Sequence, residues 1–266
     1  MKPEVVNHGK TRIVDNSVIA ERFSAAAKTY HRHNCLQQLS RDALFNGIKP
    51  TGTLLDIGAG PGTDFSQFAD VSSVIALDIA EGMLEQLKKT YPNYETLCAD
   101  AKSIPLPENS IDSVYSNLAL QWCDDLSQSF HSTAKVLKPS GEYHLAMVAQ
   151  GSLPELTQLG FRANEFRALP EISSQFDAQE WQVFSSTLEP MTVYFDDLKS
   201  LLYSIKGVGA SIHADAKVSS QSRSMVNHGI RGRGDWVKLI EQAERLRTPQ
   251  GIPLTYQIAL IRAVKR

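Results

Sequence analysis

Leu54-Leu55-Asp56-Ile57-Gly58-Ala59-Gly60-Pro61-Gly62-Thr63 is a short aliphatic run that passes directly into three closely spaced glycines. Glycine adopts backbone torsions that other residues avoid, and it lets a ligand approach the main chain closely. An aliphatic strand that ends in such a loop is typical of an α/β sheet, at the edge where ligands bind. We therefore expect a small-molecule site around Gly58 and Gly60.

The sequence downstream of residue 53 alternates short aliphatic runs with helical stretches. The runs at residues 53–57, 73–77, 94–98, 111–116 and 142–148 have the length and composition of strands. The stretches at 61–69, 82–90 and 126–137 have helical periodicity. This alternation predicts an α/β fold, a Rossmann-like parallel sheet with helices on both faces.

The remaining segments are predicted to surround this sheet. Four units are expected: an N-terminal helical layer (1–50), an α/β core (51–150), an insertion for substrate or partner (151–241) and a C-terminal strand returning to the sheet (242–266). Helices are expected at 15–47, 154–167 and 196–205, strands at 186–195 and 254–264, and an aperiodic loop at 217–234.

The composition excludes several classes of protein. The chain has 266 residues, 42% of them hydrophobic, and a net charge of −2, which argues against a strongly basic nucleic-acid binder. It contains no apolar run near the ~18 residues of a membrane-spanning helix. Its three cysteines have no CxxC spacing, so we expect neither a disulfide framework nor a metal site. With a polar N-terminus, these features predict a cytoplasmic protein.

The glycine spacing and a nearby acid indicate the kind of ligand. A dinucleotide site requires a third glycine at position 63, and this chain has Thr63 there. Asp56, two residues before the first glycine, would repel a pyrophosphate but suits a ligand that carries an ammonium group. S-adenosylmethionine carries one, and we take it as the expected cofactor. The alternative is that the glycines form only a tight turn.

Two further acids follow the next two predicted strands. Asp78 is placed to accept hydrogen bonds from ribose hydroxyls, and Asp100 from the adenine amino group. Either acid alone could instead be a helix cap. Because the acids follow consecutive strands, a nucleoside site explains them together.

This stretch, about residues 50–150, resembles the class I methyltransferases. The resemblance implies that S-adenosylmethionine is bound by residues of the glycine loop and of the following strand ends: Asp56, Gly58, Ala59, Gly60, Asp78, Ile79, Asp100, Ala101 and Asn117.

The end of the fourth predicted strand carries candidates for the transfer site. Asn117, Gln121 and Trp122 lie where this fold faces the reactive methyl group. Trp122 could shield a sulfonium from water or attract it through its ring face. It could equally pack over the edge of the sheet.

Together with that segment, four others carry a more specific resemblance: residues 19–30, 150–156, 205–210 and 253–256. In this order they resemble the malonyl-acyl carrier protein O-methyltransferases of biotin synthesis, over about residues 15–264. The resemblance implies a carboxyl O-methyltransferase that methylates the free carboxylate of a malonyl thioester and so disguises it for fatty-acid elongation. A carboxylate with a pKa near ~4 is already ionised at neutral pH, so no general base is expected.

Substrate contacts are expected outside the glycine loop. Tyr30, on an N-terminal helix that could fold over the cofactor, is a candidate hydrogen-bond donor to the carboxylate; the alternative is a half-buried aromatic. Lys206 is the candidate cation that selects malonyl over acetyl.

The charge distribution suggests where a partner docks. Residues 198–234 carry six Lys or Arg against one acid, whereas residues 51–100 carry two against eight. An acidic acyl carrier protein could dock on this basic segment, for which Arg223, Arg231 and Arg233 are candidates beside Lys206. A solvated face is the simpler explanation, and a malonyl-coenzyme A substrate is also open.

Three other functions compete with this interpretation. A methyltransferase of the same fold could act on another small carboxylic acid, an amine or a quinone-type ring. A nicotinamide-dependent oxidoreductase is disfavoured by Asp56 and Thr63. A non-catalytic S-adenosylmethionine-binding module would show no turnover.

Overall fold

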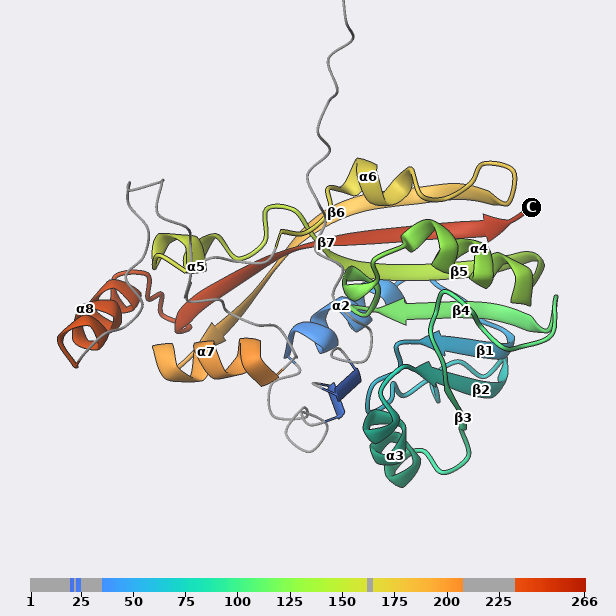
Figure 1. Cartoon of the computed structure of the whole chain (residues 1–266), viewed down its shortest axis with the longest axis horizontal. Coiled ribbons are helices and arrows are strands. Elements are labelled where there is room, and N and C mark those ends of the chain that lie inside the picture. Colours follow the sequence, from blue (N-terminus) through green and yellow to red (C-terminus); the bar gives the residue numbers. More distant parts are fainter. Residues whose placement is uncertain (1–19, 22, 25–34, 162–164, 208–232) are drawn as a thin grey trace, which may run out of the picture.

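The computed structural model describes the chain apart from residues 1–19, 22, 25–34, 162–164 and 208–232, and its elements form one seven-stranded sheet flanked by helices (Figure 1). The strand order is β3-β2-β1-β4-β5-β7-β6. Strands β1 to β5 are parallel, and β7 runs antiparallel to both β5 and β6. The strands are β1 (Gly52–Ile57), β2 (Val71–Asp78), β3 (Glu95–Cys98), β4 (Ile111–Asn117), β5 (Leu137–Ala149), β6 (Trp181–Phe195) and β7 (Ile252–Lys265).

Helices cover both faces of the sheet because its central strands are apolar on both sides. On one face, α2 (Cys35–Phe45) packs against β4 and β5, and α3 (Glu81–Thr90) packs against β2 and β3. On the other face, α4 (Leu126–Val136) and α6 (Leu169–Ser173) cover β5 and β6. Successive residues of β1 alternate between these two cores: Leu54 belongs to the first and Leu55 to the second.

The parallel register brings the carboxyl ends of the central strands to one edge. Ile57 at the end of β1 pairs with Leu77, and Asp78 at the end of β2 pairs with Cys98. Asn117 ends β4 beside Ala146. The loops after β1, β2, β3 and β4 therefore meet at this edge, as the sequence predicts.

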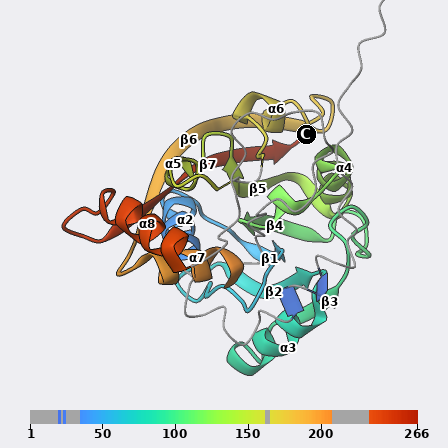
Figure 2. The same cartoon turned by 60° about the vertical axis from the view of Figure 1, so that its left-hand side comes forward.

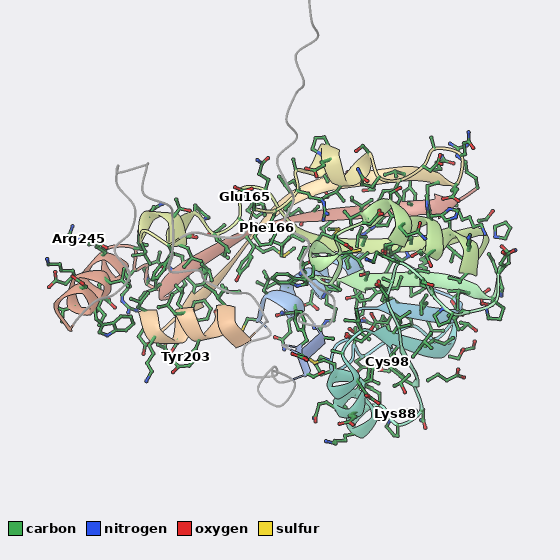
Figure 3. The ribbon with its side chains drawn as sticks, viewed as in Figure 1. Lys88, Cys98, Glu165, Phe166, Tyr203 and Arg245 are labelled. Atoms are coloured by element: carbon green, nitrogen blue, oxygen red, sulfur yellow. The ribbon has the colours of Figure 1, made fainter. Side chains whose placement is uncertain are left out.

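Strands β6 and β7 are long and extend past this edge. Their far end carries α5 (Pro154–Gln158), α7 (Leu198–Gly207) and α8 (Arg233–Glu244), which group together in both views (Figures 1 and 2). With the side chains drawn, Tyr203 and Arg245 mark this end, while Lys88 and Cys98 mark the part of the molecule around α3 and β3 (Figure 3). The C-terminal strand joins the sheet as predicted, and β6 completes it as an edge strand.

The structure corrects the expectation of a helix at residues 61–69. This segment forms turns, with the backbone N–H of Phe68 bonded to the carbonyl of Phe65 and that of Val71 to the carbonyl of Phe68. Gly62 has a φ of +102°, which lies outside the helical region, and turns at residues 66–67 and 69–70 then lead into β2 at Val71. Phe65 is instead drawn into the core beside Tyr115, with 5.2 Å between ring centroids.

The segment after residue 151 also differs from expectation. The helix expected over 154–167 ends at Gln158, because Gly160 with a φ of +81° stops it. Helix α6 was not expected, and α8 begins inside the stretch expected to be a loop. Of the helices expected over residues 15–47, the structure describes α2 and a short helical piece at Ala20, Glu21, Phe23 and Ser24.

A search of the described residues found neither a helix with the length and apolar character to cross a membrane nor a cluster of three or more metal-ligating side chains.

Candidate active site

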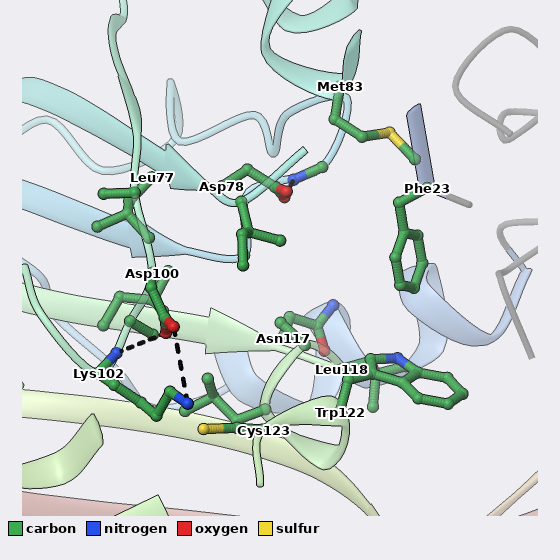
Figure 4. Close-up of a pocket in the computed structure, with 18 residues that line it drawn as sticks. Phe23, Leu77, Asp78, Met83, Asp100, Lys102, Asn117, Leu118, Trp122 and Cys123 are labelled. Atoms are coloured by element: carbon green, nitrogen blue, oxygen red, sulfur yellow. Dashed lines mark hydrogen bonds and ion pairs between the residues drawn. The ribbon is translucent and has the colours of Figure 1, made fainter. Parts of the chain in front are cut away.

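A pocket lies at the strand edge where the sequence places the small-molecule site. It encloses about 780 Å³ of space, which includes the solvent at its open mouth. Its walls come from the glycine loop, the ends of β2 and β3, the start of α3 and the segment after β4 (Figure 4). Of the expected cofactor residues, seven line it: Gly58, Gly60, Asp78, Ile79, Asp100, Ala101 and Asn117.

The two glycines of the loop are needed for different reasons. Gly58 has a φ of +71°, and a Cβ there would lie 2.1 Å from the Cβ of Ala119. Gly60 has a φ of +54°, and a Cβ there would meet no protein atom within 4 Å. Gly58 is therefore required by packing, whereas Gly60 leaves open space on the wall of the pocket. Its backbone forms the cradle that a ligand would fill.

Asp78 organises this cradle. Its Oδ2 accepts a hydrogen bond of 2.8 Å from the backbone N–H of Gly60, and its Oδ1 accepts one of 2.8 Å from that of Ala80. Burial raises the pKa of this carboxyl, and the backbone hydrogen bonds act in the opposite direction. Each oxygen retains a second lone pair, so the carboxylate can hold the loop and accept a hydroxyl from a ligand.

Asp100 lies at another side of the pocket, in a charged network. Its Oδ1 accepts the backbone N–H of Lys102 at 2.9 Å, and the Lys102 Nζ lies 3.8 Å from its Oδ2 (Figure 4). The same Nζ pairs with Asp124 at 2.7 Å, and this hydrogen bond is the main cause that raises the pKa of Lys102. Lys102 thereby links the loop after β3 to the loop after β4.

Asp56 is not among the lining residues. Its side chain is 2% exposed, and its Oδ2 has no hydrogen-bond partner among the described residues. Burial raises its pKa well above the ordinary carboxyl value, and the negative charge of Asp78 raises it further. Ala59 is also absent from the lining and packs with Leu84 and Leu87. Direct contact of Asp56 or Ala59 with a cofactor stays a prediction.

The segment after β4, residues 117–125, is held by hydrogen bonds from several elements. Asn117 lines the pocket, but its amide is tied to α2: it donates to the carbonyl of Gln37 at 3.0 Å and accepts from the Ser40 hydroxyl at 2.7 Å. Arg167 donates two hydrogen bonds, to the carbonyls of Cys123 at 3.0 Å and Asp124 at 2.9 Å. These bonds anchor the segment against the pocket.

The three expected transfer residues have different placements. Trp122 lines the pocket, in the short 3₁₀-helix η2 (Leu120–Trp122). Gln121 does not line it; its Nε2 donates to the carbonyl of Leu118 at 2.6 Å. Tyr30 lies outside the described residues.

Two of the four residues expected to bind the malonyl group or its carrier also lie outside the described residues. Arg223 and Arg231 lie outside the described residues. Lys206 belongs to the last turn of α7 and Arg233 to the first turn of α8, and their roles stay predictions.

Comparison with known proteins adds to this geometry. Residues 55–145 match a family model described as a methyltransferase domain. A malonyl-[acyl-carrier protein] O-methyltransferase from Salmonella typhimurium is 36% identical over 205 residues, which cover 74% of this chain and 81% of that protein. The protein of the same name from Gallionella capsiferriformans is 30% identical, with 92% and 89% covered. The chain belongs to the malonyl-[acyl-carrier protein] O-methyltransferase family.

Two further similarities extend this assignment. The biotin biosynthesis bifunctional protein BioHC of Cellvibrio japonicus is 30% identical over 92% of this chain, which matches 49% of that longer protein. The solved structure of the YcgJ protein from Bacillus subtilis covers 89% of this chain and 98% of its own, with a TM-score of 0.52 and 19% identity. The latter similarity confirms the Rossmann-like α/β fold. Members of this family are methyltransferases, and this one depends on S-adenosylmethionine.

Independently of these comparisons, the pocket of this methyltransferase has features that suit S-adenosylmethionine. The cradle at Gly60 is open, and the carboxylates of Asp78 and Asp100 lie at successive strand ends. In the family pattern these acids would hold the ribose hydroxyls and the adenine amino group. The apolar side chains of Met83, Leu118 and Trp122 also line the pocket.

Several side chains at or behind the pocket of this methyltransferase were not expected from the sequence. Phe23, Met83, Lys102 and Cys123 line the pocket, and Arg167 holds the segment behind Trp122. Phe23 and Met83 look like ordinary core positions on amphipathic helices. Arg167 is an isolated charge in a stretch without periodicity. No local signal distinguishes them, because their roles come from contacts between distant segments.

Alanine substitutions at the two loop glycines should affect stability and cofactor affinity differently. Gly60→Ala places a left-handed alanine in the loop, at a cost of about 1–2 kcal/mol, and its methyl group occupies open pocket space. Gly58→Ala adds the clash with Ala119. We expect Gly58→Ala to lower the free energy of unfolding in urea by more than Gly60→Ala does. Gly60→Ala should lose S-adenosylmethionine affinity, measured by calorimetry, while it stays folded. Equal stability of the two variants would contradict this account.

Asp56 should show its burial in the pH dependence of stability. The raised pKa means that the folded chain retains a proton that the unfolded chain releases, so ionisation costs stability as pH rises above about 4. Asp56→Asn removes this cost. We expect the variant to be more stable than the parent at pH 7 and to converge with it near pH 4, by urea unfolding. A constant difference across this range would show that Asp56 is not the cause.

Affinity for S-adenosylmethionine, measured on the same Asp56→Asn protein, tests the predicted contact with the cofactor ammonium. If Asp56 contacts that ammonium group, the Asp56→Asn protein should bind S-adenosylmethionine more weakly than the parent, although it is more stable. Unchanged affinity would remove Asp56 from the cofactor site.

Proposed function

We propose that the chain transfers a methyl group from S-adenosylmethionine to the free carboxylate of a malonyl group carried on an acyl carrier protein, an early step of biotin synthesis. The observation that carries the proposal is the 36% identity to the Salmonella typhimurium malonyl-[acyl-carrier protein] O-methyltransferase over 81% of that protein. The biotin setting is supported by the name of the Cellvibrio japonicus relative.

The chemistry of this acceptor agrees with the side chains that line the pocket. A malonyl carboxylate is ionised at neutral pH and needs no general base. The pKa of the Cys123 thiol is raised to about 11, chiefly by burial, so this group stays protonated and is a poor nucleophile. No histidine is among the described lining residues. The residues present suit an acceptor that arrives already activated.

The chain's own contribution is then positioning and exclusion of water. When bound, S-adenosylmethionine supplies an electrophilic methyl group on a sulfonium. Met83, Leu118 and Trp122 provide apolar walls, and a carboxylate that leaves water there becomes a stronger nucleophile. The bonds of Asn117 to α2 and of Arg167 to the following segment hold one wall in place for in-line transfer.

The acceptor carboxylate also needs a cation to pair with. Lys102 lines the pocket but is engaged by Asp124 and lies beside Asp100. We therefore keep Lys206 as the candidate that selects malonyl over acetyl, with Tyr30 as a hydrogen-bond donor and Gln121 near the transfer site. Residues 198–234 contain six Lys or Arg and one acidic residue, and this positive excess supports docking of an acidic carrier protein. The proposed contacts are Arg223, Arg231 and Arg233.

We place this reaction in the cytoplasm. All three cysteines, Cys35, Cys98 and Cys123, are unpaired, as is usual where thiols are kept reduced.

The proposal is tested by incubating the purified chain with methyl-labelled S-adenosylmethionine and malonyl-acyl carrier protein and following the carrier by intact mass. We expect one methyl group on the malonyl carrier, lost on mild alkaline hydrolysis because it is an ester. Acetyl-carrier protein and free malonate, which lack either the carboxylate or the carrier, should stay unmodified.

Malonyl-coenzyme A in the same assay shows whether the chain recognises the carrier protein or only the malonyl thioester. A higher kcat/KM for the carrier form supports docking on a protein surface. If S-adenosylmethionine binds and no methyl group reaches malonyl-carrier protein, the acceptor proposed here is wrong. A free acid or an amine that is methylated instead would identify the competing function.

A further inference from the structure

The described piece of the N-terminal region meets the pocket at Phe23. The Phe23 side chain is half-buried, lines the pocket, and packs on Ala80 and Met83 at the start of α3. Its ring contacts the Trp122 ring edge to face, with 6.0 Å between centroids and 67° between planes. Phe23 therefore connects the wall formed by α3 to the wall that follows β4.

The close-up places Phe23 opposite the charged side of the pocket. Its ring lies between Met83 and Trp122, across the pocket from Asp100 and Lys102 (Figure 4). The described charged lining residues are Asp78, Asp100 and Lys102. The Phe23 end of the pocket thus has apolar and aromatic groups, Met83, Leu118 and Trp122, beside the amide of Asn117. An aromatic face that points at a desolvated cation attracts it through the ring quadrupole.

A glycine of α3 provides the seat for this segment. A Cβ at Gly82 would lie 3.1 Å from the Cβ of Ser24, 3.2 Å from its Cα and 3.3 Å from its carbonyl oxygen. The N-terminal backbone thus approaches the helix more closely than a side chain there would comfortably allow. Gly82 is in the first turn of α3, and glycine is a poor helix former. Helix formation therefore does not explain a glycine at position 82, whereas the close approach of Ser24 does.

We propose that Phe23 is a cofactor-contact residue that closes the sulfonium end of the pocket, and that Gly82 seats the backbone that holds it there. The inference rests on the S-adenosylmethionine site and not on the identity of the acceptor. Its test is therefore a binding measurement on the full chain, without an acceptor, so that failure of the malonyl assignment leaves it unaffected.

The seat is tested by Gly82→Ala, with Gly234→Ala as the matched control. Gly234 also lies in the first turn of a helix, α8, and a Cβ there would meet nothing within 4 Å. Gly234→Ala should leave the thermal midpoint of the ligand-free chain equal or higher, because alanine favours helix. Gly82→Ala should stay folded with a midpoint close to that of the parent, because the gain in helix propensity offsets the contacts that are lost when Ser24 shifts. Only Gly82→Ala should weaken S-adenosylmethionine binding, by roughly tenfold in Kd by calorimetry, which is the size of an aromatic contact with a cation.

The contact itself is tested by Phe23→Ala and Phe23→Leu, each titrated with S-adenosylmethionine and with uncharged S-adenosylhomocysteine. Phe23→Leu keeps an apolar cover but loses the aromatic face, so it should weaken binding of the charged ligand more than that of the uncharged one. Phe23→Tyr should bind both as the parent does.

The double variant Phe23→Ala with Gly82→Ala decides whether the two positions act together. Because Gly82 acts through Phe23, the double variant should bind no more weakly than Phe23→Ala alone. The proposal would be overturned if Gly82→Ala bound S-adenosylmethionine as tightly as the parent. It would also be overturned if the Kd of the double variant rose by the full product of the two single increases. Equal losses for both ligands in Phe23→Leu would overturn the role of the aromatic face.

Discussion

The carboxylate of Asp78 joins two backbone segments, the glycine loop through Gly60 and the entry to α3 through Ala80. These bonds are the constraint on which the site depends, since the loop and the start of α3 form adjoining walls of the pocket. They also connect the cofactor cradle to the helix on which Phe23 rests. Burial disfavours the charged form of Asp78, and the two backbone donors compensate for part of that cost.

A second set of bonds fixes the wall across the pocket. Lys102 ties the loop after β3 to Asp124, and Arg167 caps the carbonyls of Cys123 and Asp124 after η2. Arg167 follows α5, in the part of the chain that carries the elongated β6 and β7. The insertion is thereby connected physically to the segment that presents Trp122.

The sequence predicts most of the sheet and the location of the pocket, because these follow from local patterns. Aliphatic runs and positive-φ glycines specify the end of β1, and Asp78 and Asp100 follow successive strands. The helix expected at 61–69 is absent because tertiary packing draws Phe65 inward. The contact of Phe23 with Trp122 and the bonds of Arg167 join residues distant in the chain, and a single sequence contains no local sign of them.

The central claim is that S-adenosylmethionine binds in the pocket that Asp78 organises. A crystal structure of the chain with S-adenosylhomocysteine tests it most directly. The account predicts ribose hydroxyls within hydrogen-bond distance of the Asp78 carboxylate, while that carboxylate still accepts the backbone N–H groups of Gly60 and Ala80, and the adenine beside Asp100. A nucleoside bound elsewhere, or one whose ribose makes no contact with Asp78, would contradict it.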